Sequence, residues 1–334
     1  GFSLASPEDT LVHVAIFPPE AIEETLPLDI IVPEVPEPFP GIDPALVQMN
    51  NALNHRGDSV RNAYISSWLA GVSTDEIARN TGLPSDAVSK ILRTSMGNYR
   101  AIAGFISGAG EKAGLALRIL ENISEKDLRD TPASVLADHL DNAPDPAPGS
   151  DIALYDSYVL SPRISDELLS PFRSQLKALP GELTASFISD PAAAAAWSDT
   201  SITITNIENH YSVPIIPGAV LRMRMADSHS RDIFFIALCR NAGVPSRFAP
   251  GTGRPQYHSA GEWHDVWFTG DNRPSGTPGF LTFVPGHGSR MNQEPEYHVH
   301  FTLARIENGR FNTLDYGYGT KLSDMPVKIP LDPG

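Results

Sequence analysis

One stretch of the chain constrains its fold more than any other, residues 227–247: Asp-Ser-His-Ser-Arg-Asp-Ile-Phe-Phe-Ile-Ala-Leu-Cys-Arg-Asn-Ala-Gly-Val-Pro-Ser-Arg. The unbroken apolar run from Ile233 to Cys239 predicts a buried helix. Gly243, followed by Val-Pro, is a typical helix stop, and a strand is predicted after it. This order indicates a helix packed on a sheet.

Composition sets wider limits on the protein. The 334 residues hold 25 basic and 40 acidic side chains, a formal net charge of −15, which argues against nucleic acid or an anionic membrane as a bulk partner. The single cysteine excludes an internal disulfide. No apolar run approaches the roughly 20 residues of a membrane span.

The chain divides by composition into four segments. Residues 1–50 are acidic and rich in proline, which predicts an extended arm with at most one strand at Leu11–Phe17. Apolar positions at helical spacing predict a helical region over 51–150, which ends in the proline-rich loop 142–149. Residues 151–320 alternate between helical and strand-like patterns. Residues 321–334 contain a strand-like run at 327–331, which we expect to begin a further β module of a longer surface protein.

The helical region contains a pattern typical of a helix-turn-helix, over residues 73–92. Ser73 and Glu76 predict a capping box, Gly82 a tight turn, and Ser85 the cap of the second helix. A helix that binds DNA needs several basic or amide side chains on one face. The second helix offers only Lys90 and Arg93 against Asp86, so we favour a plain helical hairpin over a DNA-binding regulator.

Several short motifs between residues 97 and 320 resemble a family of transglutaminase-like proteins from Bacteroidetes-type bacteria. They include Gly97-Asn-Tyr-Arg-Ala-Ile, Tyr158-Val-Leu-Ser-Pro-Arg, Ser230-Arg-Asp-Ile-Phe-Phe, Trp263-His-Asp-Val and Leu314-Asp-Tyr. The resemblance implies a cysteine-protease-like core. It also implies a secreted or lipid-anchored protein of the cell envelope, with a targeting segment ahead of Gly1.

The resemblance also locates the three catalytic positions of the family, a cysteine, a histidine and an aspartate. They fall on Ser228, Gly261 and Val284. A helix N-terminus favours a thiolate, but a hydroxyl there needs a strong neighbouring base to become a nucleophile. A Ser, Gly, Val set cannot relay a proton. We therefore expect a catalytically inactive member, with Ser228 serving as a helix N-cap.

A Ser228-dependent hydrolase or acyltransferase is the alternative. Its base would be His229, His258 or His264, and the carboxylate that orients the base would be Asp227, Asp232 or Asp265. His264 follows Trp263 in a predicted strand, and neighbouring strand residues point to opposite faces. We therefore expect His264 to face away from Ser228 if Trp263 faces the helix.

The only cysteine and the histidines supply two further hypotheses. Cys239 lies in an apolar helical run, so we interpret it as core packing and not as a nucleophile. His298 and His300 would share one strand face and could seat a zinc ion with His258, His264 or His287. Such a pair is more often simply a hydrogen-bonded or solvated face, so no metal and no cofactor are predicted.

A cleft without catalytic residues can still bind a ligand. The candidate binding residues are Arg222, Tyr257, His258, Trp263, His264 and Asp265, with Tyr211, Arg224, Arg254 and Trp267 nearby in sequence. Aromatic side chains stack on sugars or hold peptides, and arginine pairs with carboxylates. We interpret Trp263 and Trp267 first as cover for the core. The leading prediction for the chain is an α+β protein that binds a peptide or glycan or serves as a structural module. The sequence leaves the ligand and the oligomeric state open.

Overall fold

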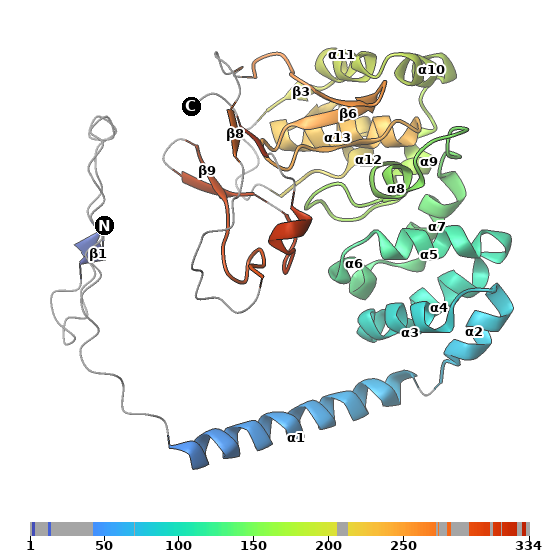
Figure 1. Ribbon diagram of the computed structural model, residues 1–334. Helices are drawn as coiled ribbons and strands as arrows, with labels where there is room; N and C mark the ends of the chain where they lie inside the picture. Colours follow the sequence, from blue (N-terminus) through green and yellow to red (C-terminus); the bar gives the residue numbers. More distant parts are fainter. Residues whose placement is uncertain are drawn as a thin grey trace. The chain divides into compact units, whose positions relative to one another are not determined.

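The computed structural model describes residues 2–3, 13–14, 43–69, 71–205, 213–271, 273, 279–281, 294–307, 310–314, 316–325 and 329–331 (Figure 1). The chain is α+β, with helices preceding most of the strands. It separates into two compact units, residues 1–60 and residues 61–334.

The described residues of the N-terminal segment form a short strand pair and a long helix. Strand β1 (Phe2–Ser3) pairs antiparallel with β2 (His13–Val14), which lies within the predicted strand at 11–17. Helix α1 spans Pro44–Leu69. It begins there because the Asp43 carboxylate accepts the Ala45 N–H at 2.9 Å and proline suits a first helical position. Residues 44–50 are therefore helical, contrary to the expectation of an extended arm up to residue 50.

The next helices pack around the first apolar core. They are α2 (Thr74–Thr81), α3 (Ser85–Thr94), α4 (Tyr99–Gly108), α5 (Ala113–Glu121), α6 (Glu125–Asp130) and α7 (Ala133–Asn142), with short 3-10 turns at Met96–Asn98 and Gly110–Lys112. Their core includes Leu92, Ile106, Ile119 and Leu136. It also takes in Leu160, beyond the loop at 142–149, so packing continues across that loop.

The predicted helical hairpin is formed by α2 and α3. Ser73 accepts the Glu76 N–H, and Gly82 has a φ of 72° at the end of α2. The expectation that Ser85 caps α3 is wrong: Pro84 holds the cap position, and the Ser85 hydroxyl donates to Asp75 at 2.6 Å, which ties the two helices together. The exposed face of α3 carries Asp86, Lys90 and Arg93, as expected for a hairpin of mixed charge.

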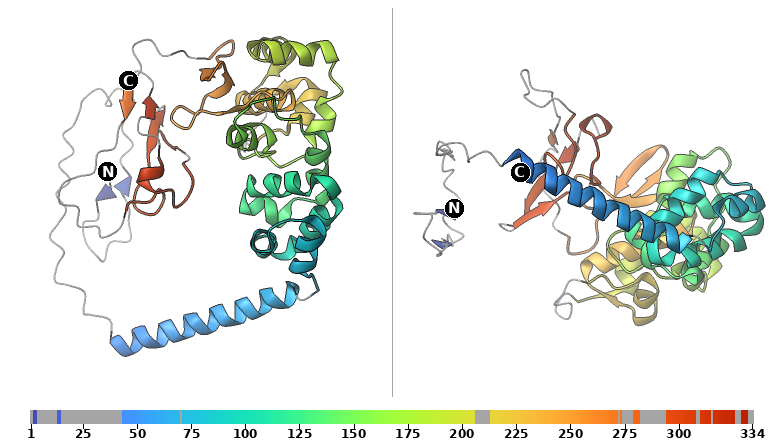
Figure 2. Two further views of the ribbon diagram at one scale, coloured as in Figure 1. Left: turned by 45° about the vertical axis from the view of Figure 1, so that its right-hand side comes forward. Right: turned by 90° about the horizontal axis from the view of Figure 1, so that it is seen from below.

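A second core surrounds α13 (Ser228–Asn241), which is buried along Ile233–Arg240. The helices around it are α8 (Ile152–Tyr155) with a π-helical turn at Asp156–Leu160, α9 (Phe172–Leu176), α10 (Gly181–Ser189), α11 (Ala192–Ser201) and α12 (Pro217–Met223). The cyan helices α2–α7 lie together, and the green to yellow helices follow beside them (Figure 1, Figure 2).

The strand predicted after α13 opens a three-stranded antiparallel sheet. Its strands are β5 (Ser246–Phe248), β6 (Pro255–Ser259) and β7 (Glu262–Asp265), in that order. Tyr257 and Phe248 pack against the core of α13, so one face of the sheet covers the helix. A parallel pair, β3 (Thr203–Ile204) with β4 (Met225–Ala226), lies just ahead of α13.

The remaining strands form two antiparallel pairs. Strand β9 (Ala304–Glu307) pairs with β10 (Arg310–Thr313), and β8 (Gly279–Leu281) pairs with β11 (Ile329–Leu331); a 3-10 turn spans Leu322–Asp324. The strand-like run at 327–331 thus pairs with an earlier strand of the same unit. Tyr297, Met325 and Ile329 form a small third core beneath these strands.

Within the described residues, none of the helices combines the length and the apolar character that crossing a membrane requires.

His139 of α7 makes stability depend on pH. Its imidazole is fully buried, Nε2 lies 2.9 Å from the Ser170 carbonyl oxygen, and the ring packs edge-on against Phe172. Burial and the nearby charge of Arg173 lower the pKa of His139 to about 3. Below about pH 6.5, the ordinary pKa of histidine, the unfolded chain therefore binds a proton at His139 and the folded chain does not. The free energy of unfolding decreases as the pH is lowered.

We predict that His139→Gln removes this part of the acid sensitivity, because an amide can still donate to Ser170 but does not titrate. From about pH 6 to pH 4.5 the wild type should lose about 1.4 kcal/mol per pH unit more than the variant. Urea unfolding at each pH measures the difference, with His55→Gln on the exposed face of α1 as control. Equal slopes for wild type and His139→Gln would contradict the assignment.

Candidate functional site

The N-terminus of α13 is built around Asp227 and Ser230. The Asp227 carboxylate accepts the Ser230 N–H at 2.9 Å and the Ser230 hydroxyl at 2.6 Å, and the Ser230 oxygen accepts the Ile215 N–H at 2.8 Å. The expectation that Ser228 is the N-cap is therefore wrong. Asp227 holds that position because its carboxylate reaches the third helical N–H, and Ser228 is the first helical residue, half-buried.

His229 lies beside Ser228 and contacts a carboxylate. Its Nε2 is 2.9 Å from Asp166 Oδ1, and its ring stacks on Phe248 with 5.4 Å between centroids. Although partial burial opposes it, the hydrogen bond and charge of His229 lower the pKa of Asp166. Consecutive helical residues point about 100° apart, so sequence adjacency alone does not aim His229 at the Ser228 hydroxyl.

Asp232, the second of the three carboxylates considered for catalysis, is bound to arginine. It accepts from Arg231 at 2.9 and 3.0 Å, and Asp271 also pairs with Arg231 at 3.3 Å. Burial and the charge of Asp271 outweigh Arg231 and raise the pKa of Asp232 to about 6. The Arg231 guanidinium in turn lies 3.8 Å from the centre of the Phe268 ring. This cluster ties the start of α13 to the loop that follows the sheet.

Gly261 occupies the turn between β6 and β7, not a strand. Ala260 and Gly261 both have positive φ angles, 53° and 88°, which is the pattern of a two-residue hairpin turn. The left-handed backbone of this turn favours glycine, and this accounts for Gly261 at the position where the resemblance would place a histidine. Val284 and Tyr211 lie outside the described residues.

The hairpin sorts the candidate binding residues onto two faces. Trp263 pairs with His258 on one face, and His264 pairs with and stacks on Tyr257 on the other. The face of Tyr257 packs on the core of α13, so Trp263 lies on the outer face. His264 thus shares the face that covers α13, and its Nε2 lies 3.1 Å from the Ser259 carbonyl oxygen.

Asp265 and Arg222 are engaged elsewhere. Asp265 accepts from Arg254 at 2.9 Å and from Gln256 at 2.7 Å, and Arg254 lies over the Trp267 ring at 4.5 Å. Arg222, on α12, donates to Gln175 at 3.2 Å. Arg224 lies over Trp197 at 5.0 Å. These residues are brought into separate pairs and not into one cleft.

A cavity of about 620 Å³ lies beside the end of β5, between the turn at 156–160 and the loop at 249–253. Its lining includes Tyr158, Arg163, Asp166, Arg240, Arg247 and Phe248. Asp166 and Phe248 are the two residues that hold His229, so the cavity adjoins the N-terminus of α13. None of the six binding residues predicted from sequence lines it.

The three arginines of the cavity have different partners. Arg163 forms ion pairs with Asp127 and Glu167. Arg240 donates to the carbonyl oxygens of Ser161, Arg163 and Ser246. Arg247 forms no ion pair with a described carboxylate.

Arg247 is instead held by neutral groups. Its Nε donates to Gln256 at 3.1 Å, and its Nη1 lies 3.4 Å from the Tyr158 hydroxyl. Its guanidinium lies 3.9 Å from the centre of the Trp263 ring and 5.4 Å from that of Tyr158. The sequence motif Pro-Ser-Arg contained the signal: alternation along β5 places Arg247 on the face opposite Ser246 and Phe248. The arrangement can hold an anion, and the platform of aromatic rings fixes the direction from which it approaches.

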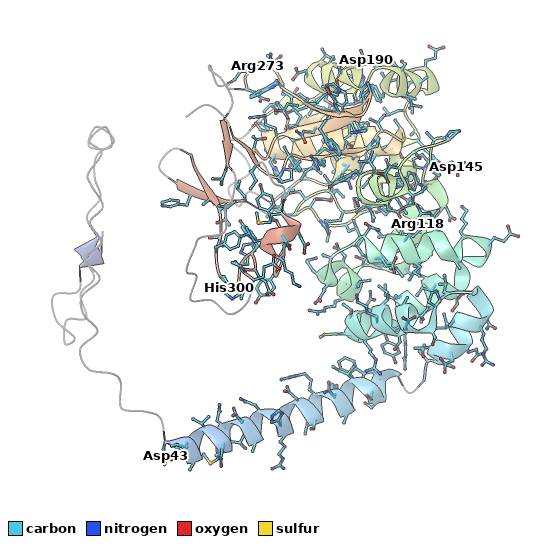
Figure 3. All side chains as sticks on the ribbon, viewed as in Figure 1. Asp43, Arg118, Asp145, Asp190, Arg273 and His300 are labelled. Carbon is cyan, nitrogen blue, oxygen red and sulfur yellow. The ribbon has the colours of Figure 1, made fainter. Side chains whose placement is uncertain are left out.

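The histidine pair at 298 and 300 does not lie on a strand. Residues 298–300 form a turn, in which His298 has a φ of 61° and His300 Nδ1 accepts the Glu296 N–H at 3.0 Å (His300 is labelled in Figure 3). The expected shared strand face is therefore wrong. Among the described residues, no group of three or more His, Cys, Asp or Glu side chains is arranged to hold a metal ion. His287 lies outside them.

Cys239 is fully buried on α13, and this burial raises the pKa of its thiol far above the ordinary value. A thiol that stays protonated at neutral pH is a poor nucleophile. Cys239 therefore packs in the core.

Comparison of the chain with protein-family models, with curated proteins and with solved structures finds no match.

The hairpin turn gives a direct test of the explanation for Gly261. Ala260→Asn should stabilise the protein by about 1 kcal/mol, because asparagine tolerates the left-handed conformation that alanine adopts there at a cost. Gly261→Ala should destabilise it by about the same amount, through the backbone alone, since an added Cβ at 261 meets no atom within 4 Å. Thermal unfolding of both variants measures this, and a neutral Gly261→Ala would contradict the turn.

Proposed function

We propose that residues 151–320 form a transglutaminase-like domain that binds a peptide or glycan carrying a carboxylate and does not turn it over. Two features support the family: the polar N-terminus of α13, and the packing of that helix on the antiparallel sheet that follows it in the chain. The resemblance of the motifs between residues 97 and 320 points the same way. We place the protein in the bacterial cell envelope on that resemblance.

The observation that carries the proposal is the environment of Arg247. A guanidinium in a cavity, stacked on Trp263 and without a carboxylate partner among the described residues, is suited to bind a planar anion through two parallel hydrogen bonds. The aromatic ring of Tyr158, which lines the cavity and packs at right angles to Trp263, offers a surface for a sugar ring or an apolar side chain. Both a peptide and an acidic glycan combine these two chemistries.

The same geometry argues against catalysis. Gly261 lies in a hairpin turn and supplies no base, and Cys239 is buried. The hydrolase alternative rests on one observation, the His229–Asp166 pair next to Ser228. It requires His229 to reach the Ser228 hydroxyl while Asp166 holds its other nitrogen.

Binding is tested with a panel of acidic and neutral peptides and oligosaccharides in isothermal titration. We predict that Arg247→Met weakens binding of the acidic members by 10- to 100-fold, on the order of the 1.5–3 kcal/mol of charged hydrogen bonds. Arg254→Met is the matched control: Arg254 also lies over a tryptophan ring, that of Trp267 just after β7, but it already pairs with Asp265. An equal loss in both variants would contradict a specific role for Arg247.

Catalysis is tested separately with acyl esters and glutamine-containing peptides. We predict no burst of product, and no difference between the wild type and Ser228→Ala. Turnover that disappears in Ser228→Ala and in His229→Ala would establish the hydrolase alternative instead, because both members of a relay are needed for its rate.

A further inference from the structure

Helix α1 exposes an apolar stripe along its whole length. Its large apolar side chains Leu46, Met49, Leu53, Val60 and Tyr64 are each between 53% and 64% exposed. At about 100° per residue, these five and Trp68 fall within an arc of about 100°. Tyr64 and Trp68 already pack edge to face on this stripe, with 4.6 Å between ring centroids. Figure 3 shows the side chains projecting all along α1 from its labelled start at Asp43.

Such a helix is unusual for a chain in water. Apart from the half-buried Ile65 and Trp68, its side chains from Pro44 to Trp68 are exposed. An isolated helix gains little stability from propensity alone, and most helices depend on packing of an apolar face. Among the residues that the structure describes, no segment covers this stripe, although a face of this composition normally has a partner.

The composition of the stripe suits a second copy of the same helix. No charged residue falls within the arc; the nearest, Arg56 and Arg61, lie at its margins. Two identical stripes can therefore meet without bringing like charges together, as a charged seam would. Gly57 lies near the middle of the stripe and lets two backbones approach closely.

The order of the side chains favours an antiparallel pair. Leu46 and Trp68 are equally far from Gly57, and Met49 and Tyr64, like Leu53 and Val60, are nearly so. An antiparallel arrangement places Leu46 opposite Trp68 of the other copy, Met49 opposite Tyr64 and Leu53 opposite Val60. The distance between the two helix axes therefore stays similar along the pair. A parallel arrangement would gather both pairs of aromatic rings at one end and splay the helices.

The stripe is also large enough. Burying four aliphatic and two aromatic side chains on each copy removes on the order of 600 Å² per helix, or about 1,200 Å² for the pair. This reaches the range of about 1,200–2,000 Å² that stable interfaces bury. We propose that α1 is a self-association helix that pairs antiparallel with α1 of a second copy of this chain.

Sedimentation velocity of the full chain tests the proposal, over about 5–100 μM because dimers dissociate on dilution. The expected mass is twice the 36.1 kDa of one chain. Leu53→Glu should give the monomer, since it places a charge in the apolar seam. Asn62→Glu, on the opposite exposed face of the same helix, should leave the dimer intact. Circular dichroism verifies that both variants keep their helix.

The direction of pairing is tested by charge rescue. Position 53 of one copy lies near position 60 of the other only in the antiparallel pair. Leu53→Glu combined with Val60→Lys in one chain should therefore restore the dimer, whereas a parallel pair would set glutamate against glutamate. A wild-type monomer throughout the concentration range, a dimer that survives Leu53→Glu, or a failed rescue would each overturn the proposal.

Discussion

The larger unit depends on two buried arginines that bind backbone carbonyl groups. Arg173 of α9 donates to Val159 at 2.5 Å and Leu160 at 3.2 Å, and Arg240 of α13 donates to Ser161 at 2.9 Å. Val159 and Leu160 end the π-helical turn and Ser161 follows it, so no further helical N–H groups are available to these carbonyls. Burial lowers the pKa of both arginines to about 10, so both stay charged at neutral pH. A cation there satisfies the carbonyls and complements the negative end of the helix.

This arrangement decides where the cavity lies. The segment fixed by Arg173 and Arg240 carries Tyr158 on one side and Arg163 on the other, and both line the cavity. Arg163 in turn pairs with Asp127, whose carboxylate also accepts from Ser124 at the start of α6. Despite its burial, these partners hold the pKa of Asp127 below its usual range. The first helical core thereby positions one wall of the cavity, and β5 supplies the other wall with Arg247.

The polar side chains at the start of α13 already have partners. Asp227 accepts from Ser230, and the Ser230 oxygen accepts the Ile215 N–H. Arg231 donates to Asp232, and these bonds stabilise the helix end. A polar group already committed to such bonds is costly to divert to chemistry. By contrast, Arg247 on β5, the next strand along the chain, has no carboxylate partner among the described residues, and its neighbours are aromatic rings.

Much of this architecture follows from local sequence. The apolar run at 233–239 specifies a buried helix, Gly243-Val-Pro ends it, and the spacing over 73–92 specifies a helical hairpin, because periodicity and backbone preference act within a few residues. Asp43-Pro44 was an equally local start signal for α1 and could have been recognised. The two histidines at 298 and 300 suggested a strand only because alternation is ambiguous in short runs.

The site was beyond local reasoning. Arg247 meets Tyr158 across 89 residues, Arg240 meets Ser161 across 79, and His229 meets Asp166 across 63. The residues next to each of these side chains in the sequence do not indicate which distant residue it will contact. The sequence by itself determined the buried helix and the helical hairpin, and it has serine, glycine and valine at the three positions where the resemblance would place catalytic residues, 228, 261 and 284. Only the tertiary structure decided which charged side chains pair with one another and which arginines line the cavity, because both depend on packing between distant segments.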